Sequence, residues 1–143
     1  MKGATLRVEA ALALALAWTL VFLVPLRHMR RLFGVVTGPT GNGAPLPGPV
    51  LARAQAVARR VDRVAGRLPW QSTCLVRAVA ARLLLARRRI DGGIIRFGIR
   101  KTDGALEAHA WLILGGTILM GGEEVETYAP LADLAAAGRR TVR

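Results

Sequence analysis

The pattern of apolar and polar residues changes character along the 143-residue chain. An uncharged, alanine-rich run comes first, over Ala10–Leu26. From Val50 onward, valines and alanines recur at three- and four-residue steps with arginines between them, which is the spacing of an amphipathic helix. After Gly93 the apolar residues alternate with other residues at a period of two, which is typical of strands.

Two helices are predicted in the middle of the chain. The first follows Val50 and ends at Gly66, because glycine commonly stops a helix. The second begins at about Cys74 and runs to about Arg89, where basic residues and glycines in "RRRIDGG" end it.

Three strands are predicted after the helices. "GIIRFGIRK", "ALEAHAWLIL" and "TILMGG" are separated by the turns "TDG" and Gly115–Gly116, which gives an antiparallel meander. A short helix is expected after Pro130. Helices followed by a meander predict an α+β fold in which the N-terminal helices pack on one face of the sheet.

The chain is predicted to have three parts. Residues 1–34 form an apolar helix with a basic end, and residues 35–49, rich in proline and glycine, form a linker. Residues 50–143 form the main domain, which is long enough to bury a core without disulfides.

The N-terminal apolar run allows three interpretations. It is a short transmembrane helix, an interfacial helix with a basic end, or a helix docked on the domain or a partner. A signal peptide fits less well, because the arginines follow the apolar run and no small-residue cleavage site is evident. We favour a helix that buries against another surface, with peripheral membrane contact as an alternative.

Most of the net charge of +12 lies in residues 51–100, which contain twelve arginines and only two acidic residues, Asp62 and Asp91. No nucleic-acid-binding motif accompanies it, so we do not expect a nucleic-acid partner. A positive field also suits an acidic peptide, a partner protein or an anionic membrane. The single cysteine cannot form an internal disulfide, which favours a reducing compartment such as the cytoplasm.

Cys74 is the residue with the clearest chemical potential. Ser72 and Thr73 are typical N-cap residues, so Cys74 is expected in the first helical turn, where thiolates are stabilised. The side-chain amide of Gln71 is a candidate donor to an oxyanion. Free cysteines are also common as small buried hydrophobic residues, and this alternative stays open.

His109 is the candidate base. It lies within a predicted strand between Ala108 and Ala110, whereas His28 is expected on the surface. A histidine in a strand is often only a hydrogen-bonded structural residue. A cysteine that opens a helix and a histidine on a later strand is nevertheless the arrangement of papain-like and transglutaminase-like enzymes.

Several motifs carry a more specific resemblance. "WQSTCLVRAVAARLLLARR", "FGIRK", "AHAWLIL" and "GGEEVETYAPL" together resemble the leader peptidase of lasso-peptide biosynthesis, often called the B protein. That family is transglutaminase-like. The resemblance covers about Val50 to Leu134, and the N-terminal helix resembles the start of the family's stand-alone form.

The resemblance implies a cysteine protease that removes the leader from a ribosomally made precursor peptide. Cys74 would be the nucleophile and His109 the general base, with no cofactor or metal. The implied partners are the precursor peptide, a leader-recognition-element protein and the lasso cyclase that closes the macrolactam.

The third catalytic residue departs from the family pattern. The expected aspartate position falls on Gly121. A simple two-residue turn would place His109 opposite Gly122, which also lacks a side chain. Glu123 is our first choice for the orienting group, ahead of Glu124 and Glu107 (a backbone carbonyl or a water molecule is the further alternative).

Two rival functions and one rival chemistry are also compatible with the sequence. The chain could be an inactive relative that binds a peptide or partner, or a small membrane-associated subunit. Within the same fold, an amine acceptor in place of water would give acyl transfer instead of hydrolysis.

Overall fold

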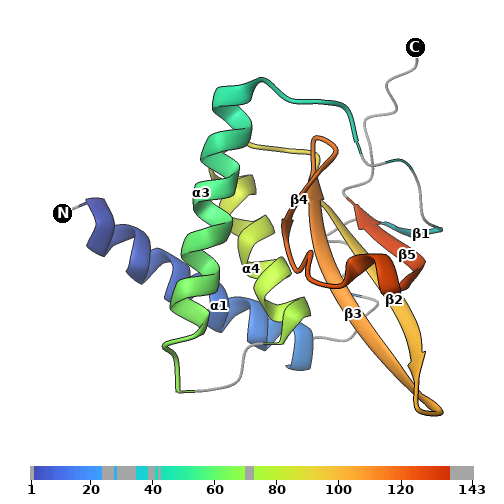
Figure 1. Ribbon diagram of the computed structural model, residues 1–143. Coiled ribbons are helices and arrows are strands. Elements are labelled where there is room, and N and C mark those ends of the chain that lie inside the picture. Colours follow the sequence, from blue (N-terminus) through green and yellow to red (C-terminus); the bar gives the residue numbers. More distant parts are fainter. Residues whose placement is uncertain are drawn as a thin grey trace.

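The computed structural model describes residues 2–23, 28, 35–38, 41, 43–69 and 73–135. Helices form one layer and a single sheet forms the other (Figure 1). The predicted α+β class is therefore confirmed. The elements are α1 (Lys2–Leu23), β1 (Val35–Thr37), α3 (Gly48–Ala65), α4 (Cys74–Arg87), β2 (Ile94–Thr102), β3 (Ala105–Leu114), β4 (Thr117–Met120), the 3₁₀ turn η1 (Val125–Thr127) and β5 (Ala129–Ala135).

The two central helices form where the apolar spacing predicts them. Helix α3 has a proline in its first turn and ends at Gly66, and it buries one face consisting of Ala54, Val57, Ala58, Val61 and Ala65. Helix α4 begins at Cys74, because the Thr73 hydroxyl accepts a hydrogen bond of 3.2 Å from the Val76 amide.

The sheet has the strand order β1-β5-β2-β3-β4, and its neighbouring strands are antiparallel. The predicted meander β2-β3-β4 is confirmed. Asp103–Gly104 and Gly115–Gly116 form its turns with positive φ angles, which suits the twist of two-residue hairpins. Helices α3 and α4 pack on one face of this meander, against β4 and β3 respectively.

The end of the sequence folds differently from the prediction. The short helix expected after Pro130 is wrong, because Ala129–Ala135 form β5 in the interior of the sheet. Asp133 explains the difference. It lies opposite Arg96 in the β2–β5 register, and its fully buried carboxylate accepts two hydrogen bonds from that guanidinium, of 2.8 and 3.0 Å.

The segment predicted as a linker also contributes to the sheet. Val35–Thr37 form β1, which pairs with β5 at the sheet edge. Residues 43–47 leave this region without regular structure and lead into α3. The three-part division of the chain is otherwise a prediction that the structure leaves open.

Helix α1 packs on both α3 and α4. Ala10, Leu14 and Ala17 of its contact face are completely buried in the main core, and Leu20 and Val21 pack against that core partly buried. The helix begins well before the uncharged run, so Arg7 and Glu9 lie inside it. The sequence analysis favours a helix that buries against another surface, and the structure shows α1 docked on the domain.

A partly buried ion pair fastens α1 to the end of α4. Both carboxylate oxygens of Glu9 accept hydrogen bonds of 2.9 Å from Arg88, and the Glu9 side chain is only 16% exposed. The hydrogen bonds from Arg88 lower the pKa of Glu9 below its ordinary value, against the opposing effect of burial.

The Glu9–Arg88 pair makes stability depend on acidity. A carboxyl group whose pKa is lower in the folded state stabilises the fold above its unfolded pKa, and this contribution is lost as pH falls through the folded pKa. We expect Glu9→Gln to lower the free energy of unfolding by about 1 kcal/mol at pH 7. Below pH ~4 the difference between the variant and the wild type should be smaller, because Glu9 is then becoming protonated.

Urea unfolding at several pH values measures this effect. Glu126→Gln is the matched control, because Glu126 is exposed and has no hydrogen bond or ion pair in the described part of the chain. Equal pH profiles for wild type and Glu9→Gln would show that the pair does not stabilise the docked helix.

Candidate active site

Cys74 is the first residue of α4, and its side chain is partly exposed. The Thr73 cap satisfies one amide of the first turn, and the remaining amides give this end of the helix partial positive charge. This arrangement favours an anion at the helix start. Gln71 and Ser72 lie outside the described residues, so the predicted oxyanion role of Gln71 stays a prediction.

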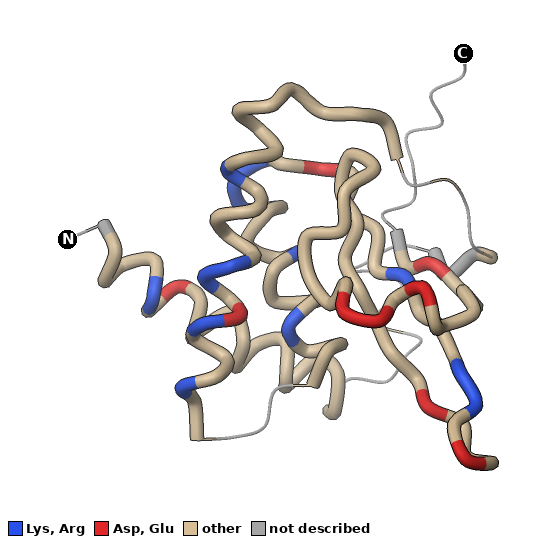
Figure 2. The backbone as a smooth tube through the Cα atoms, in the orientation of Figure 1, with Lys and Arg blue, Asp and Glu red and all other residues tan. Residues whose placement is uncertain are grey.

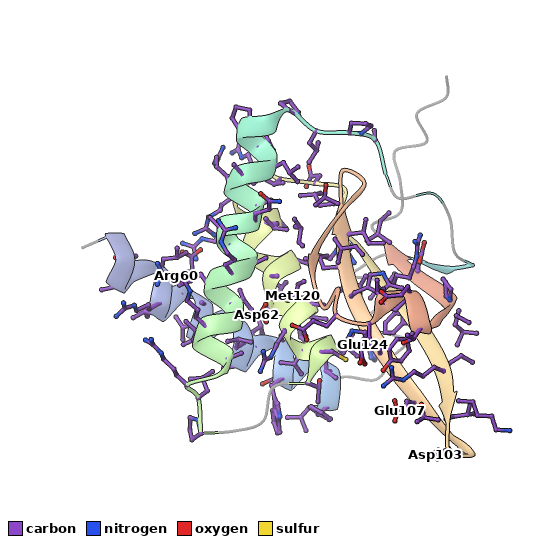
Figure 3. The ribbon with its side chains drawn as sticks, in the orientation of Figure 1. Arg60, Asp62, Asp103, Glu107, Met120 and Glu124 are labelled. Atoms are coloured by element: carbon purple, nitrogen blue, oxygen red, sulfur yellow. The ribbon has the colours of Figure 1, made fainter. Side chains whose placement is uncertain are left out.

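Cys74 and His109 line the same pocket, although they are far apart in the sequence. The pocket has a volume of ≈ 410 Å³ and lies between the helices and the edge of the sheet, where Asp62 on α3 faces Met120 on β4 (Figure 3). Its lining consists of Asp62, Cys74, Arg77, His109, Met120, Gly121 and Glu123. The structure therefore unites the predicted nucleophile, the predicted base and Glu123.

The imidazole of His109 is held by a backbone group. Its Nε2 atom lies 2.7 Å from the carbonyl oxygen of Gly121. A carbonyl oxygen can only accept a hydrogen bond, so Nε2 is the nitrogen that carries the proton in the neutral ring. Nδ1 then keeps its lone pair and is the nitrogen able to act as a base.

The hydrogen bond identifies which of the proposed groups contacts the imidazole. Of the alternatives weighed from the sequence, it is the backbone carbonyl, and it belongs to the residue where the family pattern places an aspartate. Glu123 lies on the pocket wall without a hydrogen bond to His109 among the described contacts. A catalytic role for Glu123 remains a prediction.

An irregular register brings Gly121 beside His109. The simple pairing predicted for β3 and β4 holds for Leu114–Thr117 and Ile113–Ile118, but Met120 then pairs with Leu112 instead of Trp111. The predicted pairing of His109 with Gly122 is accordingly wrong. One residue is inserted on β4 at this bulge, and such an insertion redirects the strand that carries it.

Position 121 has no room for a side chain. Gly121 has a φ angle of +75°, and a Cβ atom there would lie 2.8 Å from the carbonyl oxygen of Ala110. Absence of a side chain therefore allows the loop to approach β3 closely enough for the Gly121 carbonyl to reach the imidazole.

Arg100 holds the loop that follows Gly121. Its guanidinium donates to Glu124 and Thr127, each at 3.0 Å, and lies 4.5 Å from the centre of the Tyr128 ring. On the other side it donates to Glu107 at 2.7 Å. Glu107 and Glu124, both considered as orienting groups from the sequence, are thus bound to Arg100 and absent from the pocket wall.

Two aromatic rings pack against the imidazole of His109. The ring centres of Tyr128 and Trp111 lie 5.1 and 5.9 Å from that of His109. Trp111 is buried and packs over Gly98, where a Cβ atom would lie 2.7 Å from the indole. Sequence reasoning missed Arg100, Tyr128 and Gly98 as supports, because each acts through residues distant in the chain.

A charged pair forms the wall next to Cys74. Arg77 lies one turn along α4 from the cysteine and donates to Asp62 on α3 at 3.2 Å. This bond links the start of α4 to α3. In the described part of the chain, no group of three or more His, Cys, Asp or Glu side chains is placed to hold a metal ion.

A comparison with protein-family models supplies the family. The model described as "Transglutaminase-like superfamily" matches residues 20–133, most of the chain. The chain belongs to the transglutaminase-like superfamily. No curated protein and no solved structure gives a significant match.

The transglutaminase-like superfamily includes cysteine proteases, and the matched residues contain both Cys74 and His109. The predicted transglutaminase-like α+β fold is confirmed. Most of α1 lies before the matched segment, although it shares the core of the transglutaminase-like domain.

Gly121 should tolerate substitution poorly. We expect Gly121→Ala to destabilise the fold by about 1–2 kcal/mol through its φ angle, with at least about 1 kcal/mol more from the contact with Ala110. Gly104→Ala is the matched control, since Gly104 has a φ of +83° and open space around it.

Urea unfolding of the two variants separates the cost of a side chain at a positive φ angle, which both share, from the cost of the steric contact with Ala110, which only Gly121→Ala has. Equal losses of stability would mean that the loop at residue 121 shifts freely and that the close approach is not a constraint.

Proposed function

We propose that this protein is a cysteine peptidase that removes the leader from a ribosomally synthesised lasso-peptide precursor before the macrolactam closes. The observation that carries peptidase chemistry is the shared pocket of Cys74 and His109. The transglutaminase-like family supports that chemistry in general. The motifs "CLVRA" and "AHAW" support the specific substrate, through their resemblance to lasso leader peptidases.

The first half of the reaction uses the nitrogen left unprotonated by the Gly121 contact. Nδ1 of His109 accepts the thiol proton, and the Cys74 sulfur attacks the carbonyl carbon of the scissile peptide bond. The imidazolium then donates its proton to the leaving nitrogen. The C–N bond breaks, the core peptide leaves with a free amine, and the leader remains as a thioester on Cys74.

Water completes the reaction with the same base. His109 removes a proton from water, whose oxygen attacks the thioester carbonyl, and the C–S bond breaks. The leader leaves with a carboxyl group, and the proton returns to the Cys74 sulfur. The freed amine of the core peptide is the group that a macrolactam-forming cyclase requires.

The Gly121 carbonyl sets the electrostatics of the base. A neutral acceptor fixes the tautomer and orientation of His109, but it stabilises the imidazolium less than a carboxylate in the same place, since charge-assisted hydrogen bonds are roughly twice as strong. Glu123 also lines the pocket, so its carboxylate is the proposed source of negative charge there.

Removal of either reacting group should abolish cleavage. We expect Cys74→Ala and His109→Ala each to lower the cleavage rate by roughly a thousandfold or more, and the double variant to lose little beyond either one, because the two residues act as a unit. Mass spectrometry of the precursor after incubation measures leader removal. Substantial cleavage by Cys74→Ala would refute the proposal.

Two further experiments define the orienting group of the base and the acceptor of the thioester. Glu123→Gln should retain most of the activity if the Gly121 carbonyl is the orienting group, whereas a large loss would assign that role to the carboxylate. Trapping the thioester and identifying its acceptor distinguishes hydrolysis from acyl transfer, and an amine acceptor would replace the peptidase proposal.

A recognition-element protein and the lasso cyclase are the proposed partners besides the precursor. We expect the recognition-element protein to accelerate cleavage at dilute precursor, because tethering raises the local substrate concentration to as much as roughly the millimolar range. Rates with and without this protein at low and saturating precursor test the dependence. Equal rates at low concentration would contradict it.

A further inference from the structure

The outward face of α1 is apolar along most of its length. Six of the nine exposed large hydrophobic side chains in the described residues belong to this helix, although it supplies only a small part of the chain. Their exposed fractions run from 38% to 68%, and the residues are Val8, Leu12, Leu16, Trp18, Phe22 and Leu23. Isolated exposed leucines are ordinary, but a continuous apolar face of this kind marks an interaction surface.

The outward face of α1 carries few polar groups. The Thr19 hydroxyl donates to the Ala15 carbonyl of its own helix at 2.9 Å, so it presents no unsatisfied donor. Arg7 is exposed near the start of the helix. Among the described residues, the segment Gly3–Leu23 is the helix long and apolar enough to cross a membrane, with a mean hydropathy of 1.9.

A groove extends this face toward α4. It has a volume of ≈ 710 Å³ and lies between the exposed side of α1 and Leu83, Leu84 and Arg87 of α4. Its lining is mostly apolar but includes Glu9, and the Nε atom of Arg87 at its border lies 3.7 Å from that carboxylate. The Arg87 side chain is nevertheless 75% exposed, whereas Glu9 is 16% exposed and accepts its hydrogen bonds from Arg88. An apolar groove with a cation at its border suits a molecule with a long hydrocarbon part and an anionic head.

The charge distribution points to the same kind of partner. Basic residues lie along the helices, whereas several acidic residues lie along the loop after β4 and the β2–β3 hairpin (Figure 2). On α3, the exposed basic residues include Arg53, Arg59 and Arg63. The helical layer that contains α1 therefore carries exposed positive charge, which complements an anionic surface.

We propose that α1 binds the surface of an anionic lipid bilayer. The helix lies in the plane of the interface with its outward side chains in the acyl region, a lipid chain occupies the α1–α4 groove, and Arg87 contacts the phosphate. This surface is separate from the Cys74 pocket, and the proposal does not depend on the peptidase activity.

The opposite face of α1 argues against a membrane-spanning orientation. Ala10, Leu14 and Ala17 are buried against the domain, and Glu9 is bound to Arg88. A spanning helix would have to leave these contacts and carry the Glu9 carboxyl toward hydrocarbon, which is costly. Lying in the interface keeps both the core contacts and the ion pair.

Flotation of the full-length protein with vesicles tests the proposal. We expect binding to vesicles of phosphatidylcholine with phosphatidylglycerol, weak binding to phosphatidylcholine alone, and weaker binding at high salt. Leu12→Ser with Leu16→Ser should lower the binding constant roughly tenfold or more, and Arg87→Gln about fivefold.

Leu106→Ser is the matched control, because Leu106 is 74% exposed at the β2–β3 hairpin, away from α1. It should bind as the wild type does, and so should Cys74→Ala. Unfolding curves establish that each variant is folded before its binding is compared.

Four outcomes would overturn the proposal. The first two are absence of binding by the folded wild type and equal binding to neutral and anionic vesicles. The third is a stable dimer in light scattering that Leu12→Ser with Leu16→Ser dissociates, which would make this face a contact between two copies of the chain. The fourth is extraction from membranes by detergent but not by alkaline carbonate, which would show that the helix spans the bilayer.

Discussion

The close approach of the Gly121 backbone to β3 is the constraint on which the candidate site depends. It places a carbonyl oxygen 2.7 Å from His109 Nε2 and thereby selects the nitrogen that can act as a base. Three independent features are needed for it. The β4 strand carries a bulge, residue 121 has no side chain, and Arg100 holds the following loop against β2 and β3. We expect the loss of any one of these features to weaken the contact between the imidazole and its acceptor.

The rest of the fold keeps Cys74 opposite this base. The Thr73 cap defines where α4 starts, and the Arg77–Asp62 bond ties that start to α3. On the other side of the sheet, the buried Arg96–Asp133 pair joins directly opposed residues of β2 and β5. A buried ion pair contributes little net stability, but separating its partners inside the protein is costly, so we expect this pair to disfavour other registers of β2 and β5.

Local patterns were sufficient for the elements that bring the two reacting residues together. The boundaries of β3 and the end of α3 at Gly66 follow the sequence prediction, because alternation, helical spacing and glycine turns act over a few residues. The position of Cys74 at a helix start was predicted for the same reason. Long-range effects account for the failures. "PLADLAAA" has the composition of a helix, but it pairs with β1 and β2 as a strand, and the contact of Asp133 with Arg96 lies in that pairing. Likewise, no local signal distinguishes a bulge at β4 from the simple hairpin pairing.

The use of a main-chain oxygen next to His109 changes how this site responds to mutation and to acid. An acidic side chain can be exchanged for its amide or protonated at low pH, and either event removes the negative charge that orients a histidine. The carbonyl of Gly121 has no proton to gain and persists whatever amino acid occupies the position. Its weakness is steric, because added atoms at residue 121 displace the oxygen along with the loop. Selection at position 121 would therefore act against large side chains and would not favour a particular functional group. A comparison of relatives that looks for a conserved acidic residue would overlook this main-chain acceptor.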